Sequence, residues 1–377
     1  MSAVVSALVR GSSVARRRAF SASTAWAPAL PSRVNVYEVG ARDGLQNEAT
    51  TLSVDQRLEF IEMLSHTGVH AVEVAAFVNA KRVPQMAGAA DIMSSLAPRA
   101  DRLPYPVLVP NMTGFRAAVN AGAKSVAVMA SASETFSRNN VNSTIEESVE
   151  RSIEIAAEAA KLNVSCRAYL SCALGCPFEG AVAPSVVADI AARLFTDANG
   201  AVYEVVLSDT IGTGTAGDMA KLLRLTLPRV PAHALAVHCH DTYGQALANI
   251  YCALEHGIAT VDSSVAGLGG CPFAGPGAAG NVATEDVVYM LNGLDIETGV
   301  DFDRVVDAGE WAVAQLGREN ASKAALASLR RGRGSQSEMA ARAQPPRLSM
   351  PGSEFSTACP EPAWQRSKGG QDGTRLQ

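Results

Sequence analysis

The sequence predicts an α/β protein built as one (β/α)8 TIM barrel, because short β-branched segments alternate eight times with longer segments whose apolar residues recur at helical spacing. Strands are expected near residues 34–40, 71–77, 105–109, 124–130, 164–171, 202–208, 234–239 and 260–266. Helices are expected near residues 53–66, 84–96, 112–121, 144–161, 184–198, 215–228, 243–256 and 282–292, with an additional C-terminal helix over 303–328. A doubly wound open sheet is the competing fold, but the G-x-G-x-x-G fingerprint does not follow the first strand.

Three segments of different composition divide the chain. Residues 1–30 contain several arginines among many alanines and serines and no acidic residue, which is typical of a cleaved mitochondrial transit peptide and implies import into the mitochondrial matrix. Residues 31–329 hold the predicted barrel. Residues 330–377 are rich in Arg, Gly, Ser, Pro and Gln without periodicity, so we expect an atypical, disordered tail there.

The overall composition excludes several classes of protein. No apolar stretch approaches the roughly 20 residues that span a bilayer, so no membrane segment is expected. The formal net charge of -5 and the lack of a single basic stripe argue against a nucleic-acid partner. The seven cysteines show no C-x-x-C spacing, which favours a reducing compartment over a disulfide or zinc framework.

Polar residues lie within, at the end of or just after the expected strands, near the points where barrel enzymes carry their chemistry. They are Arg42, Asp43, Glu73, Asn111, Ser171, Cys172, Asp209, His238 and His240. Any one of them could lie there by chance, because loops are polar, but their chemical types point to a shared site.

His238 and His240 flank Cys239 at the end of the seventh expected strand. Since side chains alternate across a strand, both imidazoles project to the same side and can reach one ion. Asp43 adds a hard oxygen, and a mixed nitrogen and oxygen donor set suits catalytic Mg²⁺ or Mn²⁺ better than a closed structural zinc. The alternative is a pair of histidines satisfied by other neighbours, because the H-x-H spacing alone is only moderately specific.

The stretch from Gly267 to Asn281 is too rich in glycine for regular structure and lacks the Lys-Ser/Thr ending of a phosphate-binding loop. We interpret it as a mobile loop in which Cys271 is a candidate proton donor; a plain flexible connection is the alternative. Asn281 is either the N-cap of the next helix or a metal ligand through its amide oxygen. Cys172 and Cys176 are interpreted as pocket lining.

Six segments carry a resemblance to a known family. They are EVGARDGLQNE (38–48), FVNAKRVPQM (77–86), YLSCALGCPFEG (169–180), SDTIGTGT (208–215), AVHCHDTYGQALAN (236–249) and VDSSVAGLGGCPFA (261–274). Over about residues 34–329 the chain resembles 3-hydroxy-3-methylglutaryl-CoA lyases. The Arg-Asp-Gly and His-x-His elements also occur in the wider DRE-TIM metallolyase superfamily, whereas the glycine loop with its Cys-Pro and the VPQM segment are more particular to the lyases.

The resemblance implies a metal-dependent retro-Claisen cleavage of 3-hydroxy-3-methylglutaryl-CoA to acetyl-CoA and acetoacetate, as in ketone-body synthesis and leucine degradation. The implied partner is a small-molecule acyl-CoA, and the implied assembly is a homodimer. The implied metal ligands are Asp43, His238, His240 and Asn281, and the implied catalytic residues are Arg42, Cys271, Glu73, Asp209 and His238. Arg42 would stabilise the enolate and Cys271 would protonate it. Glu73 and Asp209 would orient substrate and ligands, and Gln46 would lie near the substrate.

Three other functions remain open. An acetyl-CoA-condensing synthase of the same superfamily would share the metal site, but it should carry a further domain after the barrel, and residues 330–377 show no pattern of one. A lyase for a longer branched 3-hydroxyacyl-CoA would share the chemistry and differ in pocket size. A catalytically dead scaffold barrel is disfavoured by the intact Arg42, Asp43, His238 and His240.

Overall fold

The computed structural model describes residues 30–99, 103–270 and 279–331. Within these ranges the strands are β1 (Asn35–Glu38), β2 (Ala71–Val72), β3 (Ala75–Ala76), β4 (Val107–Leu108), β5 (Ser125–Ser131), β6 (Ser165–Ser171), β7 (Val202–Asp209), β8 (Leu235–Cys239) and β9 (Thr260–Ser263). The α-helices are α1 (Val54–Ser65), α2 (Ala89–Leu96), α3 (Met112–Asn120), α4 (Glu134–Val141), α5 (Ile145–Lys161), α6 (Pro184–Thr196), α7 (Ala216–Thr226), α8 (Ala246–Glu255), α9 (Thr284–Gly293), α10 (Phe302–Leu316) and α11 (Lys323–Arg331).

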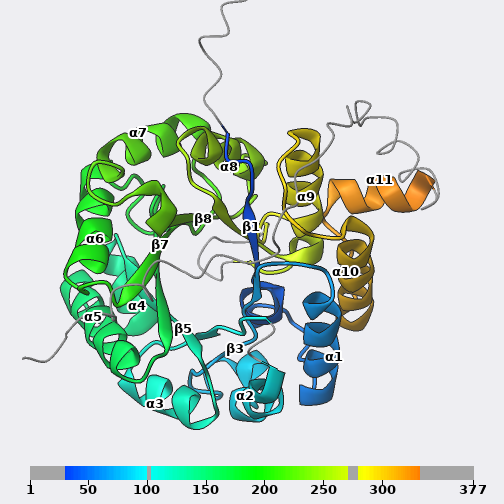
Figure 1. Cartoon of the computed structure of the whole chain (residues 1–377), viewed down its shortest axis with the longest axis horizontal. Helices are drawn as coiled ribbons and strands as arrows, with labels where there is room; N and C mark the ends of the chain where they lie inside the picture. The colour runs from blue at the N-terminus through cyan, green and yellow to red at the C-terminus, as the bar shows by residue number, and fades with distance from the viewer. Residues whose placement is uncertain (1–29, 100–102, 271–278, 332–377) are drawn as a thin grey trace, which may run out of the picture. The chain divides into compact units, whose positions relative to one another are not determined.

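The strands pair in parallel in the order β2-β1-β9-β8-β7-β6-β5-β4-β3, and this sheet closes on itself. Its two ends, β2 and β3, are halves of one strand position separated by Glu73 and Val74. The N–H of Glu73 donates to the carbonyl of Glu38 (2.8 Å), and the N–H of Val74 donates to the carbonyl of Pro106 (3.0 Å). The described strands therefore form a ring that the helices surround (Figure 1), which confirms the predicted (β/α)8 barrel.

The sequence explains how these elements pack. The strands are buried along almost their whole length, as expected where side chains fill the barrel and helices cover it. Helices α1 and α5 begin at capping boxes, in which Ser53 and Thr144 accept the N–H groups of the first turn. Because all strands run in parallel, their carboxyl ends, including Ser171 and Asp209, lie at one end of the barrel.

Several boundaries differ from those predicted. The strand expected over 71–77 is two short strands: Val72 and Val74 donate to the carbonyls of Pro104 and Pro106, which have no N–H to donate in return, so the ladder on that side is incomplete. The helix expected over 303–328 is two helices, since Gly317 takes a left-handed conformation (φ 69°) and ends α10. Helix α4 was not predicted, and it begins where the hydroxyl of Ser133 accepts the N–H of Phe136.

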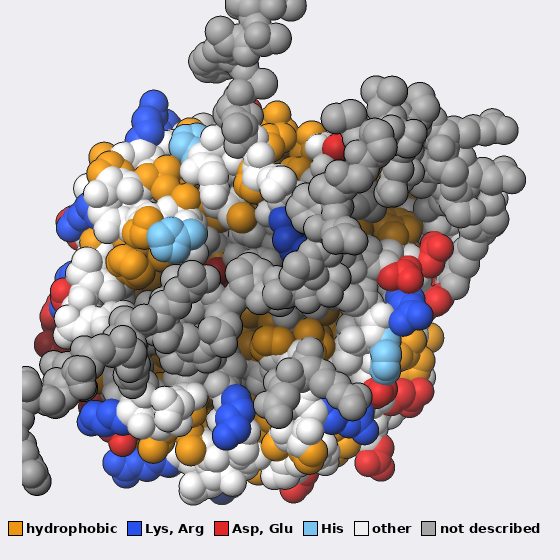
Figure 2. Space-filling view, viewed as in Figure 1, with side chains coloured by type: hydrophobic (Ala, Val, Ile, Leu, Met, Phe, Trp, Pro, Cys, Tyr) orange, Lys and Arg blue, Asp and Glu red, His pale blue; other side chains and the backbone are white. Residues whose placement is uncertain are grey.

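The predicted transit peptide over 1–30 and the predicted tail over 330–377 lie almost entirely outside the described residues. Within the described ranges, no helix combines the length and the apolarity needed to cross a membrane. On the face shown in Figure 2, basic and acidic side chains are interspersed around the rim, so neither sign of charge dominates it.

Candidate active site

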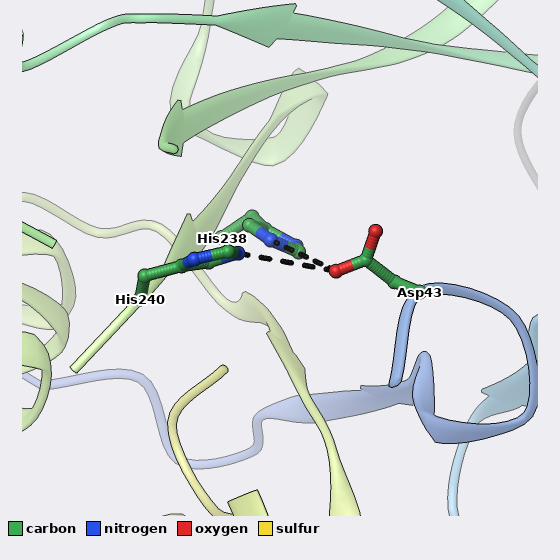
Figure 3. A group of neighbouring side chains, drawn as sticks. All are labelled: Asp43, His238 and His240. Carbon is green, nitrogen blue, oxygen red and sulfur yellow. Dashed lines mark ion pairs between the residues drawn. The ribbon is translucent and has the colours of Figure 1, made fainter. Parts of the chain in front are cut away.

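Three side chains that the sequence assigned to a metal converge at the carboxyl end of the barrel. Asp43 lies in the turn after β1, and His238 and His240 lie at the end of β8 (Figure 3). Oδ2 of Asp43 is 3.9 Å from Nε2 of each histidine, and the three candidate ligand atoms lie within 4.8 Å of one another. Both histidines are buried, so the pair forms part of the barrel interior at its mouth.

The turn that carries Asp43 depends on close packing against the loop after β9. Residues Gly40–Gly44 form one π-helical turn. A Cβ on Gly44 would lie 2.8 Å from the hydroxyl oxygen of Ser264 and 2.9 Å from Cβ of Leu268, so no larger residue fits there without movement. This packing sets the position from which Arg42 and Asp43 reach into the barrel mouth.

Asn281 joins the cluster from the segment after the glycine loop. Its amide nitrogen donates to Oδ2 of Asp43 (2.9 Å) and to the carbonyl of Leu268 (3.0 Å). Because both partners are acceptors, the atom that contacts Asp43 is the nitrogen, and the role of the amide oxygen as a metal ligand stays a prediction. The N-cap alternative was wrong: α9 begins at Thr284 with Ala283 in the N-cap position, since Asn281 instead pairs with His240 in an isolated β-bridge.

Arg42 is held in place by three acidic and aromatic neighbours. Its Nε donates to Oε1 of Glu73 (2.6 Å), and a terminal nitrogen donates to Oδ1 of Asp43 (2.5 Å). The guanidinium carbon lies 5.5 Å from the centre of the Tyr169 ring, and the Tyr169 hydroxyl donates to the other oxygen of Glu73. Glu73 thus fixes the orientation of Arg42, and its predicted role in orienting the substrate and the ligands stays a prediction.

The charges of the cluster follow from burial and from these neighbours. Burial alone would raise the pKa of Asp43, but the charges of Arg42 and the two imidazoles hold that pKa well below its usual range. Burial, together with the neighbouring His238, lowers the pKa of His240 to about 4. At neutral pH the site therefore offers a carboxylate and a neutral imidazole, which are the forms that bind a metal.

Asp209 supports this site through its backbone and its carboxylate. Its carbonyl accepts the N–H of His240 (3.2 Å), while its carboxylate accepts the N–H groups of Thr213 (3.3 Å) and Gly214 (3.0 Å). Burial raises the pKa of Asp209 to about 6. The residue thus holds the turn after β7 against the strand that carries the histidines.

A cleft of about 940 Å³ opens above the cluster. Arg42, Asp43, Gln46, Tyr169, Ser171, His238 and His240 are among the residues that line it, and Asn79, Arg82, Asn140 and Arg151 lie farther along it. A cleft of this size can hold a substantial part of a large organic substrate beside the polar cluster. The prediction that Gln46 lies near the substrate stays consistent with this position.

Three other predicted site residues have a structural role. The side chain of Asn111 accepts the N–H of Gly114 (2.9 Å) and caps α3 at the edge of the cleft. Cys172 and Cys176 were wrongly predicted to line the pocket: both are buried behind the cleft wall and pack with Phe136, which lines the cleft in their place. Cys271 lies outside the described residues.

Sequence reasoning missed Tyr169 and Asp262. Asp262 lies on β9 with Oδ2 3.3 Å from Nδ1 of His238, and the ring of Tyr169 meets that of His238 edge-on at 5.9 Å. A charged residue within a strand that reads as buried is itself a signal, because such groups are rarely buried without a partner. Asp262 and Arg167 could have been found in that way, whereas their partners depend on how the strands align.

The comparisons with known proteins agree with this geometry. The HMGL-like family model matches residues 33–311, more than half of the chain. The chain belongs to the HMGL-like family. It is 52% identical over 301 residues to the cytoplasmic 3-hydroxy-3-methylglutaryl-CoA lyase of Danio rerio, a match that covers 80% of this chain and 88% of the relative. It is 49% identical over 310 residues to the mitochondrial hydroxymethylglutaryl-CoA lyase of Rattus norvegicus, covering 82% and 94%.

Among solved structures, the hydroxymethylglutaryl-CoA lyase of Pseudomonas aeruginosa matches with a TM-score of 0.76 and 49% identity, over 80% of this chain and 99% of that chain. The relatives of this HMGL-like chain include both mitochondrial and cytoplasmic lyases at similar identity, so the likeness does not choose a compartment.

The residues of the cluster fit the divalent cation expected in this family. One carboxylate and two imidazoles form an N/O donor set suited to Mg²⁺ or Mn²⁺. Within the described part of the chain, Nδ1 of the buried His240 has no hydrogen-bond partner. No described protein group therefore donates to Nδ1 and forces the proton onto Nε2, so Nε2 is free to bind an ion. Asp43, His238 and His240 are therefore a candidate metal site.

Proposed function

We propose that this protein cleaves 3-hydroxy-3-methylglutaryl-CoA to acetyl-CoA and acetoacetate with the help of Mg²⁺ or Mn²⁺. The observation that carries this proposal is the convergence of Asp43, His238 and His240 beside Arg42 on the floor of a large cleft. It is supported by 49% to 52% identity to lyases named for this substrate.

The residues that would hold the ion are Asp43, His238, His240 and Asn281. When bound, the ion would ease loss of the proton from the tertiary hydroxyl by lowering the pKa of that group. His238 belongs to the catalytic set because it would hold that hydroxyl and the ion together. With that proton released to solvent, breaking the carbon–carbon bond turns the hydroxyl carbon into the ketone of acetoacetate and leaves an electron pair on the carbon next to the thioester.

Arg42 would stabilise the enolate that carries this electron pair on its thioester oxygen. Its fork is already oriented by Glu73 and Asp43, so little reorganisation is needed as the negative charge develops. Cys271 would then give its thiol proton to the enolate carbon and complete acetyl-CoA. Asp209 would keep the strand end that carries His240 in register.

Two further parts of the proposal concern the cell and the assembly. Residues 1–30 would direct import into the mitochondrial matrix, which a fluorescent fusion of this segment would test. The lyase would act as a homodimer, which its mass in solution would test. Residues 330–377 would be a disordered appendage to the barrel of residues 31–329.

The test is to incubate the purified protein with 3-hydroxy-3-methylglutaryl-CoA and Mn²⁺ and to measure acetoacetate and acetyl-CoA in equal amounts. A longer branched 3-hydroxyacyl-CoA serves as the competing substrate. Faster turnover of that substrate would replace the proposed specificity. Condensation of acetyl-CoA with an oxo acid, without any cleavage, would instead identify a synthase.

A further inference from the structure

A network of buried charges lies inside the barrel next to the proposed metal site. Arg167 on β6 is completely buried, and one terminal nitrogen lies 2.9 Å from Oδ1 of Asp262 and 2.8 Å from Oε2 of Glu204. Its guanidinium carbon stands 3.7 Å from the centre of the Tyr37 ring. Burying an arginine and two carboxylates together is a weak source of stability, because desolvation offsets most of their attraction. Stability alone therefore does not explain why these charges are buried here.

The second oxygen of Asp262 provides that reason. Strands β8 and β9 pair so that His238 stands opposite Asp262, and Oδ2 of Asp262 lies 3.3 Å from Nδ1 of His238. A carboxylate can only accept, so Nδ1 carries the proton in this contact. The other nitrogen, Nε2, then keeps its lone pair and lies 3.9 Å from Oδ2 of Asp43, on the side where the ligands converge.

We propose that Asp262, held by Arg167, is a positioning residue that fixes the tautomer and the ring orientation of His238 for metal binding. The inference rests on the proposed metal site and adds to it two residues that do not contact the ion, Asp262 and Arg167. A carboxylate that accepts the second N–H of a ligating histidine increases the basicity of the ligand, and removing it typically weakens metal binding. Neither Arg167 nor Asp262 touches the substrate in this account.

The two histidines differ in this respect. Nδ1 of His238 has Asp262, whereas Nδ1 of His240 is buried without a partner among the residues that the structure describes. The backbone N–H of His240 is bound to the carbonyl of Asp209. Loss of the Asp262 carboxylate should therefore release His238 and leave the support of His240 unchanged.

Glu204 offers a matched control inside the same network. It is buried, it contacts the same nitrogen of Arg167, and its contact is as short as that of Asp262. Glu204→Gln and Asp262→Asn each remove one negative charge from beside Arg167. Of these two carboxylates, only that of Asp262 contacts His238. If the network were purely structural, both variants would have the same consequences for metal binding.

The experiment measures Mn²⁺ binding to the metal-stripped full chain by calorimetry, without substrate. Asp262→Asn should weaken the affinity about 10- to 100-fold, while Glu204→Gln binds Mn²⁺ like the wild type even if its melting temperature falls. Wild-type affinity in Asp262→Asn, or equal losses in both variants, would overturn the inference. His238→Ala separates the two proposals: if it binds Mn²⁺ as tightly as the wild type, the metal site itself is wrong.

A second measurement is made on the wild-type protein. In the metal-stripped protein with ¹⁵N-labelled histidine, the His238 signals should show a proton on Nδ1 and none on Nε2. The signals are assigned by their loss in His238→Gln. A proton on Nε2 of His238 would overturn the positioning role, whatever the activity of the enzyme.

Discussion

Two groups of carboxyl groups in this barrel have pKa values that are shifted in opposite directions. At the barrel mouth, the charge of Arg42 outweighs burial and keeps the pKa of Asp43 well below its usual range. In the seam between β1, β9 and α9, Glu38 and Glu285 are more deeply buried than Asp43, and burial raises their pKa values to about 7 and about 8. Burial alone therefore does not set the charge; a neighbouring guanidinium does.

The carboxyl groups of the seam, Glu38 and Glu285, accept backbone N–H groups, whereas the carboxylate at the barrel mouth, Asp43, pairs with a guanidinium. Glu38 accepts the N–H groups of Gly40 (2.8 Å) and Val265 (3.2 Å), and Glu285 accepts the N–H of Ala266 (2.9 Å). Ala266 has a left-handed conformation (φ 55°), which is strained for alanine. The seam thus holds the turn that leads into the glycine loop, while the mouth holds the negative charge that an ion requires.

The largest effect is expected from Asp43→Asn, which removes the negative charge at the barrel mouth but keeps the shape of the side chain. Turnover should fall by about a thousandfold or more, because the ion loses its charged ligand. Arg42 remains paired with Glu73, so the circular dichroism spectrum should stay that of the wild type. Activity within a few-fold of the wild type would show that the ionised carboxylate is not needed.

The next largest effect concerns Arg42, whose fork contacts Glu73 and Asp43 at once. Arg42→Lys should lower kcat by roughly a hundredfold with little change in KM, because a flexible point charge cannot replace the guanidinium in the transition state. Steady-state kinetics separate the two constants. A raised KM with an unchanged kcat would place Arg42 in ground-state binding.

Cys271→Ala should likewise lower kcat while substrate binding is largely preserved. Thiol alkylation should inactivate the wild type, and bound substrate should protect it, because the same thiol would deliver the proton to the enolate carbon. The rate of inactivation with and without substrate is the measurement. A fully active Cys271→Ala enzyme would end the proton-donor role and leave the metal site standing.

The seam predicts a pH effect on stability. The folded protein keeps protons on Glu38 and Glu285 above pH 4.5, where the unfolded chain loses them, so the free energy of unfolding should fall as pH rises toward 8. Glu38→Gln should flatten this decline by about 1–3 kcal/mol. Urea unfolding at pH 5 and pH 8 measures it. The exposed Glu154→Gln is the control, and an equal slope in both variants would contradict the seam account.

The smallest effect is expected from truncation after Arg331, the last residue of α11. Because the removed sequence lacks periodic apolar residues, it can bury little surface, and both activity and melting temperature should stay almost unchanged. A differential scan of the two proteins tests this. A clear loss of either property would show that the removed segment packs on the barrel.

The sequence predicted the elements better than the contacts between them. The β-branched strands and amphipathic helices were found because their periodicities are local, and His238 and His240 because they are two residues apart on one strand. The division of the second strand into β2 and β3 depends on its pairing with Pro104 and Pro106, and the alignment of these segments is not recorded in any local pattern. The contact of Asp262 with His238 depends on the register of β8 and β9, and the seam at Glu38 depends on packing between distant segments.

The most direct test of the account follows cleavage while the metal-stripped enzyme is titrated with Mn²⁺. Acetoacetate should form in proportion to the fraction of enzyme with Mn²⁺ bound, it should saturate at one ion per chain, and excess chelator should abolish it. In His238→Ala both binding and cleavage should be lost together. Full cleavage of 3-hydroxy-3-methylglutaryl-CoA by the stripped enzyme in excess chelator would contradict the account.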